Sequence, residues 1–333
     1  RRRVEDRQRR RVSQTATLLL VNLCQALLFA QVFLTAQAED RLPIGVAFAG
    51  LALLSWALYG VYRAAQRSAY ELESLVFLLI SIGAAVTAAY DPSSLYKLLI
   101  TVFMGMALFL IMSGILRDLH TSIQARWPVA LAAGALLAFN VVLGERIFGA
   151  KNWISIGPLS FQPSELVKIA FILAGAATLD RLFAKRNLIF TILFSAYCVG
   201  CLALMSDFGT ALIFFVAFLC IAFLRTGDLP SIAMMVAAAA FGCGIILRFK
   251  PYIADRFSAW LHVWDHAQDI GYQQTRTMSA MASGGLFGAG ADKSWLKYIG
   301  AANTDLVFGV VGEEFGFLLA LCCVASLMLP IAF

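Results

Sequence analysis

The polar stretch 249–314 contains Ser283-Gly284-Gly285-Leu286-Phe287-Gly288-Ala289-Gly290 and Asn303-Thr304-Asp305-Leu306-Val307-Phe308. Apolar segments flank it, and it is the only long gap in the hydrophobic pattern after the basic N-terminus. Loops longer than about 15 residues in compact proteins are usually functional or disordered. The glycine cluster and the aromatic residues before it disfavour disorder. We therefore predict an ordered extramembrane loop at 249–306 that carries the reactive residues.

The composition indicates a membrane protein. The chain has 333 residues, of which 61% are hydrophobic and 14% charged, whereas about a quarter of the residues in soluble domains are charged. Apolar runs of about 17 or more residues recur, and each can cross a hydrocarbon core of roughly 30 Å as a helix. The predicted fold class is all-α, a polytopic helical membrane protein with about ten transmembrane helices. The predicted spans are 16–35, 43–62, 72–90, 95–116, 127–143, 165–180, 188–205, 208–224, 229–247 and 307–329.

The basic residues predict the orientation. Arginines crowd the N-terminal arm, and lysine or arginine recurs in every second loop, which places the N-terminus in the cytoplasm by the positive-inside rule. The segment 144–164, the turn at Asp207 and the loop 249–306 then face outward. The arm is predicted to meet anionic membrane lipids, and no nucleic-acid partner is predicted. The predicted regions are a basic cytoplasmic arm at 1–14, N-terminal transmembrane helices at 15–143, and a motif-bearing membrane region at 144–333.

Two shorter outward segments also carry polar side chains where a helix enters the membrane. Glu165 and Lys168 follow Gln162-Pro163-Ser164 and share one face of the predicted helix. Ionisable groups within a span usually mark a site, and the alternative is a neutralised pair that merely lets the helix enter. Asp207 precedes an apolar helix in Ser206-Asp207-Phe208-Gly209-Thr210, where capping the helix N-terminus is its default role.

A histidine and aspartate pattern suggests a cation as one alternative. His262, Asp265, His266 and Asp269 would form one stripe if their segment were helical. Such a stripe can bind a divalent cation. The alternative is that it forms the water-exposed face of an interfacial amphipathic helix. No other cofactor is predicted.

Three motifs, at 149–168, 207–210 and 271–316, together resemble the SEDS family (shape, elongation, division and sporulation) of FtsW/RodA/SpoVE peptidoglycan glycosyltransferases. The resemblance covers 144–333, with two extra spans before it and the family's last two spans missing after it. It implies an enzyme that polymerises lipid II, an undecaprenyl-pyrophosphate-linked disaccharide peptide, at the outer face of the bacterial cytoplasmic membrane. The implied partner is a class B penicillin-binding protein, a transpeptidase, and the implied role is cell elongation, division or sporulation.

The resemblance assigns the family's essential aspartate to Asp305. The family's other motif residues fall on Gln162, Glu165, Lys168 and Asp207. The chain departs from the family at three positions: Asn303 replaces a histidine, Leu306 replaces a phenylalanine, and Asn152 replaces a frequent arginine, with Lys151 one place earlier as a substitute charge.

The implied chemistry needs a base and positive charge. Because lipid II is α-linked and the polymer β-linked, one inverting attack by an acceptor hydroxyl suffices, and Asp305 is the predicted general base. The departing pyrophosphate needs cations or hydrogen-bond donors. The predicted substrate-binding residues are Lys151, Gln162, Glu165, Lys168, Asp207, Gln273, Arg276, Gly284 and Gly285. The two glycines would let backbone amides approach a phosphate or sugar closely, and at least one of Glu313 and Glu314 is predicted to support the site.

Two other functions remain open. A flippase or transporter for a lipid-linked substrate predicts ionisable residues at mid-membrane depth on several helices. Most of the ionisable residues of this chain lie at the outer helix ends instead. A non-catalytic scaffold for a penicillin-binding protein is the other alternative, because of Asn303 and the missing spans.

Overall fold

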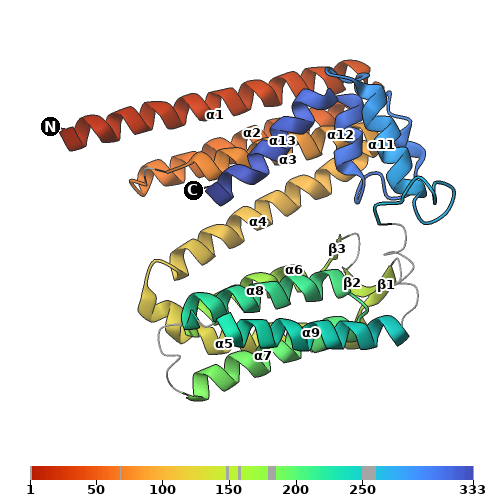
Figure 1. Cartoon of the computed structure of the whole chain (residues 1–333). Coiled ribbons are helices and arrows are strands. Elements are labelled where there is room, and N and C mark those ends of the chain that lie inside the picture. The colour runs from red at the N-terminus through yellow and green to blue at the C-terminus, as the bar shows by residue number, and fades with distance from the viewer. Residues whose placement is uncertain are drawn as a thin grey trace. The chain divides into compact units, whose positions relative to one another are not determined.

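The computed structural model describes residues 2–67, 69–147, 150–156, 159–178, 185–227, 229–249 and 260–332. It is built almost entirely of helices (Figure 1). The α-helices are α1 (Arg2–Thr35), α2 (Arg41–Ala64), α3 (Glu71–Tyr90), α4 (Leu95–Ile115), α5 (Leu119–Leu143), α6 (Pro163–Thr178), α7 (Lys185–Leu204), α8 (Phe208–Thr226), α9 (Leu229–Phe249), α11 (Tyr272–Gly284), α12 (Val307–Glu314) and α13 (Gly316–Ala332). Two short 3-10 helices, η1 (Pro92–Ser94) and η3 (Leu296–Tyr298), and three strands complete the described structure.

Most of the hydrophobic helices overlap the predicted spans. Within the described ranges, five segments are long and apolar enough to cross a membrane: Gln14–Thr35, Arg41–Ala64, Glu71–Tyr90, Pro92–Ile115 and Ile123–Leu143. Shorter apolar helices follow at Ile189–Leu204, Phe208–Leu224 and Gly316–Pro330. The large apolar side chains exposed along these helices are expected of a protein whose solvent is lipid. The prediction of an all-α, multi-pass membrane protein is confirmed.

The predicted tenth span, 307–329, is wrong as a single helix. The chain forms α12, breaks at Phe315, and restarts as α13 from Gly316. Gly316 has φ +87°, a left-handed conformation that favours glycine. A Cβ there would lie 2.4 Å from the backbone nitrogen of Gly288, so the break also requires the absence of a side chain.

The segment that follows α11 passes through this break and supplies its missing hydrogen bonds. The amides of Ala289 and Gly290 donate to the carbonyls of Glu313 and Glu314, at 2.8 and 3.0 Å. On the other side, the amides of Phe317 and Leu318 donate to the carbonyls of Gly285 and Leu286, at 2.9 and 3.3 Å. Helix ends leave unpaired amides and carbonyls that must find partners when they are buried. The glycine-rich segment therefore closes a broken helix.

A small sheet interrupts the helices between α5 and α6. Strands β1 (Glu145–Ile147), β2 (Ala150–Ile156) and β3 (Leu159–Phe161) form an antiparallel sheet in the order β1-β2-β3. The β2–β3 register pairs Ile154 with Phe161 and Ile156 with Leu159. Apolar and polar side chains alternate in this short segment, which is the sequence signal for a hairpin. The all-α prediction missed this hairpin.

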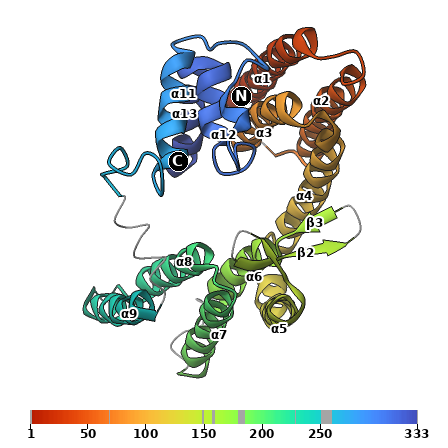
Figure 2. The same ribbon diagram turned by 90° about the vertical axis from the view of Figure 1, so that its right-hand side faces the viewer.

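The chain packs as two units. Unit 1 comprises Arg1–Ala107 and Lys250–Phe333, and unit 2 comprises Leu108–Phe249. The first core lies among α1, α2, α3, α11, α12 and α13, and within it α3 runs beside α12 and α13 (Figures 1 and 2). The second core lies among α5, α6, α7 and α8. These units differ from the regions predicted from sequence, which meet at 143/144. The reason is that the last part of the chain packs against the first part within unit 1.

Candidate functional site

Asp305 lies on a tight turn in unit 1, directly before α12. The carbonyl of Ala301 accepts hydrogen bonds from the amides of Thr304, Asp305 and Leu306, at 3.2, 2.9 and 3.1 Å. Ala301 has φ +65°, a conformation that costs a non-glycine residue free energy and persists only where the surroundings impose it. The side chain of Asp305 is exposed, and no residue in the described ranges donates to it or pairs with it. The backbone of Asp305 is therefore held in place, and its carboxylate is free to bind a ligand.

Two side chains from other helices hold the segment that leads into this turn. Gln273, on α11, donates from Nε2 to the carbonyl of Gly300 at 3.0 Å. Tyr90, at the end of α3, donates from its hydroxyl to the carbonyl of Lys297. Gln273 was predicted to bind substrate. The structure places it beside the Asp305 turn, where its amide orients backbone.

Two basic residues of unit 1, Lys297 and Arg276, each contact another side chain. Nζ of Lys297 lies 2.6 Å from Oδ1 of Asp292, and this hydrogen bond raises the pKa of Lys297. On α11, the guanidinium of Arg276 lies over the ring of Tyr272, 5.1 Å from its centroid. A guanidinium stacked on an aromatic ring keeps hydrogen-bond donors at its edge. Arg276 therefore stays a candidate for contact with an anionic group.

The two predicted glycines have different surroundings. Gly284 is buried against α12, where a Cβ would lie 2.2 Å from the carbonyl oxygen of Gly312. This burial favours a packing role for Gly284, and its predicted contact with substrate stays a prediction. Gly285 is exposed, and its predicted contact with substrate stays a prediction. The amides of Ala289 and Gly290 already serve the helix break, so they are not free to hold a phosphate.

In unit 2, Asp207 is the centre of a hydrogen-bonded cluster. Its Oδ2 accepts from Nδ2 of Asn152 and from Nε2 of Gln162, both at 3.0 Å. Its Oδ1 accepts from the amide of Thr210 at 3.2 Å, which caps α8. The predicted capping role is confirmed. The carboxylate also connects β2, through Asn152, and Gln162, the residue after β3, to the start of α8. Gln162 and Asp207 therefore have a structural role together.

Three further predicted residues of unit 2 have partners. Nζ of Lys151 donates to the carbonyls of Val141 and Val142, each at 2.8 Å, which places a cation at the negative end of α5. Nζ of Lys168 lies 2.7 Å from Oε2 of Glu165, and the predicted pairing is confirmed. The Glu165 side chain is 55% exposed and that of Lys168 is 28% exposed. A pair this accessible contributes under about 1 kcal/mol, and Lys168 can exchange its partner for another anion at low cost.

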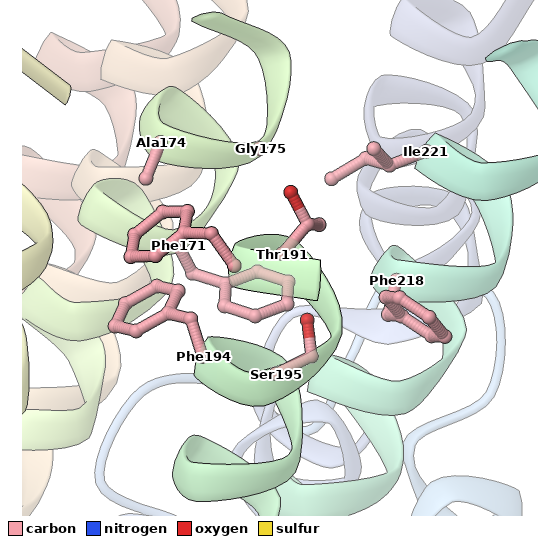
Figure 3. Close-up of a pocket in the computed structure, with 9 residues that line it drawn as sticks. Phe171, Ala174, Gly175, Thr191, Phe194, Ser195, Phe218 and Ile221 are labelled. Atoms are coloured by element: carbon pink, nitrogen blue, oxygen red, sulfur yellow. The ribbon is translucent and has the colours of Figure 1, made fainter. Parts of the chain in front are cut away.

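A hollow in the core of unit 2 has different chemistry. It lies between α6, α7 and α8 and is lined by aromatic rings together with the hydroxyls of Thr191 and Ser195 (Figure 3). Its described lining contains no ionisable group. General acid–base chemistry needs a titratable side chain, so this hollow is not the candidate active site.

The helical stripe that would have suited a cation does not form. The segment 260–271 folds as successive turns instead of a helix, so His262, Asp265, His266 and Asp269 do not share one helical face. Across the described ranges, no group of three or more histidine, cysteine, aspartate or glutamate side chains has an arrangement that could hold a metal ion.

Fold and site together define a multi-pass helical membrane protein with an exposed, rigidly held carboxylate on an extramembrane turn. The family model described as "Cell cycle protein" (FTSW_RODA_SPOVE) matches residues 68–333. The chain belongs to the FtsW/RodA/SpoVE family. The match begins near the start of α3, so the family region is longer than the 144–333 indicated by the motifs, and α1 and α2 precede it.

Curated relatives and solved structures agree with this membership. The chain is 30% identical to "Probable peptidoglycan glycosyltransferase FtsW" of Pseudoalteromonas translucida (strain TAC 125), covering 74% of this chain and 67% of that protein. It is also 30% identical to the FtsW of Halorhodospira halophila (strain DSM 244 / SL1), covering 83% and 72% respectively. A match to the Coxiella burnetii FtsW covers only 51% of that protein. The chain therefore spans between about half and three quarters of the relatives' lengths.

Two solved structures have the same fold. One, from a study described as "Structural coordination of polymerization and crosslinking by a peptidoglycan synthase complex", has a TM-score of 0.62 and 28% identity, covering 79% of this chain and 76% of that chain. The other is the rod shape determining protein RodA of Thermus thermophilus, with a TM-score of 0.52 and 24% identity, covering 79% and 73%.

Proposed function

We propose that the protein is a peptidoglycan glycosyltransferase that polymerises lipid II into glycan strands, with Asp305 as its catalytic base. The observation that carries this proposal is the Asp305 turn, where an exposed carboxylate without a partner in the described residues sits on a rigid backbone. Membership of the FtsW/RodA/SpoVE family and relatives named peptidoglycan glycosyltransferase supply the reaction class.

The reaction needs one proton transfer and one displacement. The acceptor sugar hydroxyl loses its proton to the Asp305 carboxylate as its oxygen attacks the anomeric carbon of the donor. The bond from that carbon to the pyrophosphate oxygen breaks, and the lipid pyrophosphate leaves with the bonding electrons. Because attack comes from the opposite face, the α-linked donor gives a β-linked product. Arg276 belongs to the same unit as Asp305 and is the predicted cation of that unit that would stabilise the leaving anion. Lys151 and Lys168, in unit 2, stay predicted substrate contacts.

Polymerisation of lipid II by the purified full-length protein tests this proposal against its two alternatives. A glycan ladder that forms without a partner supports the polymerase. Translocation of lipid II across vesicle membranes with no polymer would instead identify a flippase. Stimulation of a penicillin-binding protein, with no polymer made by this protein itself, would identify a scaffold.

A class B penicillin-binding protein is the proposed partner, since one structural neighbour comes from a complex described as coordinating polymerisation with crosslinking. The proposed location is the bacterial cytoplasmic membrane with the N-terminus inside. This orientation rests on the distribution of basic residues.

The orientation predicts a labelling pattern. In a background without the native cysteines, Lys293→Cys should react with a membrane-impermeant thiol reagent in intact cells. Lys185→Cys should react only after lysis, because the positive-inside rule places Lys185 in the cytoplasm. The reverse pattern would place Asp305 on the cytoplasmic side and exclude polymer synthesis at the outer face.

A further inference from the structure

Glu313 is a buried carboxylate that the proposed chemistry does not use. Its side chain is 1% exposed and accepts three hydrogen bonds from one short segment. Oε2 accepts from the hydroxyl of Ser294 and from the amide of Leu296 at 3.3 Å, and Oε1 accepts from the amide of Trp295 at 3.0 Å. A buried carboxylate is very costly unless it is well paired. These three donors explain how α12 retains one in an apolar environment.

The same face of α12 packs against the same segment. Gly309 lies one helical turn before Glu313, and a Cβ there would lie 2.8 Å from Cδ2 of Leu296. Leu296 itself is fully buried. The start of α12 and the segment at 294–296 are therefore held together by close packing at Gly309 and by hydrogen bonds at Glu313.

This contact closes a short loop with Asp305 on it. The chain leaves Leu296, passes the Gly300 carbonyl held by Gln273, forms the Asp305 turn, and enters α12 at Val307. Both ends of this loop are fixed to each other by Glu313. Among the hydrogen bonds of the described residues, those of Gln273 and Tyr90 would still hold this loop without Glu313, and the packing of Leu296 at Gly309 would remain.

We propose that Glu313 is a positioning residue, whose three hydrogen bonds to Ser294, Trp295 and Leu296 fix the Asp305 turn against α12. The proposal rests on the proposed function of Asp305. A base must lie within hydrogen-bond reach of its proton, and a misplacement of about 1 Å can cost roughly 10²-fold in rate. Glu313 itself touches neither the substrate nor the transferred proton.

Glu313→Gln is the direct test, because it keeps the side-chain size and replaces one acceptor oxygen with a donor that repels the facing donors. We expect kcat to fall roughly 10- to 100-fold with KM little changed. Hydrogen exchange of the amides in 294–306 should become faster, with no change in α8 of unit 2. Glu39→Gln, an exposed glutamate of unit 1, is the matched control and should leave both measurements unchanged.

Ser294→Ala is the milder variant, since it removes one of the three donors and leaves both amide bonds. It should give a smaller fall in kcat and keep its folded yield even where Glu313→Gln does not fold. A folded Glu313→Gln protein with wild-type kcat would overturn the proposal, as would unchanged hydrogen exchange in 294–306. If Glu313→Gln does not fold, a wild-type kcat in Ser294→Ala would overturn it. A wild-type protein that makes no polymer would refute the proposed function instead. The exchange measurement would still test whether the hydrogen bonds of Glu313 fix the Asp305 turn.

Discussion

Asp305→Asn should reduce glycan synthesis from lipid II by roughly 10²- to 10⁴-fold, the usual effect of removing a general base. The amide keeps the size of the side chain but is neutral and cannot accept the proton. Since the carboxylate is exposed and lacks any partner among the described residues, the substitution removes no contact that holds the fold. Yield, thermal unfolding and binding to the proposed penicillin-binding protein should therefore match those of the wild type. The measurement is polymer formation by purified full-length protein.

The control for this variant must be an aspartate that has no bond to lose. Asp292 is unsuitable because it pairs with Lys297 at 2.6 Å. Asp269 is exposed in the turns of 260–271, with no side-chain partner in the described part of the chain. Asp269→Asn should polymerise at the wild-type rate. Near-normal polymer from Asp305→Asn would remove Asp305 as the base and favour the scaffold or transporter.

Gly284→Ala should strongly reduce the amount of folded protein. The new Cβ would lie 2.2 Å from the carbonyl oxygen of Gly312 and 2.6 Å from that of Glu313. Overpacking typically costs about 1–3 kcal/mol and occasionally more. The upper end is expected here, because both obstacles are backbone atoms of α12, which its contacts at Gly309 and Glu313 hold in place. Thermal unfolding in detergent measures the effect.

Gly83→Ala is the matched control. Gly83 lies within α3 of the same unit, and nothing lies within 4 Å of a Cβ built there. Alanine is the better helix former by about 1 kcal/mol, so this variant should be as stable as the wild type or more so. A Gly284→Ala protein with the same unfolding temperature as Gly83→Ala would show that α11 and α12 do not pack as closely as described.

Local features of the sequence predicted much of this structure. The spans of α1 to α5 follow from hydropathy, because a long apolar run satisfies its backbone only as a helix when it crosses a membrane. The cap at Asp207 and the pair Glu165–Lys168 follow from spacing along one helix. The exposed position of Asp305 follows from its place at the end of a polar stretch.

The features that sequence reasoning missed depend on partners far away in the chain. The break at Gly316 has no hydropathy signal, because Phe315 and Phe317 are apolar, and the bonds that complete it come from 285–290. The hydroxyl of Tyr90 bonds to the carbonyl of Lys297 across 207 positions. The possible cation stripe failed for a local reason. It rested on a helical period at 260–271, where the chain makes turns.

The role of the glycine cluster was similarly hidden. Glycines that let a backbone approach a phosphate and glycines that let two backbones approach each other have the same sequence pattern. Gly284 and Gly288 belong to the second kind, since a Cβ at either position would meet the backbone of α12. One signal was available for Glu313, because a glutamate in an apolar run must be paired, but its donors at 294–296 could not be named.

Incubation of purified full-length protein with lipid II, followed by gel separation of the products, tests the central claim most directly. We predict a ladder of glycan strands that a muramidase digests, with one lipid pyrophosphate released for each disaccharide added. The ladder should form without a transpeptidase and should be absent with Asp305→Asn. Intact lipid II after incubation with the folded wild-type protein, alone and with the proposed penicillin-binding partner, would contradict the assignment of this protein as a polymerase.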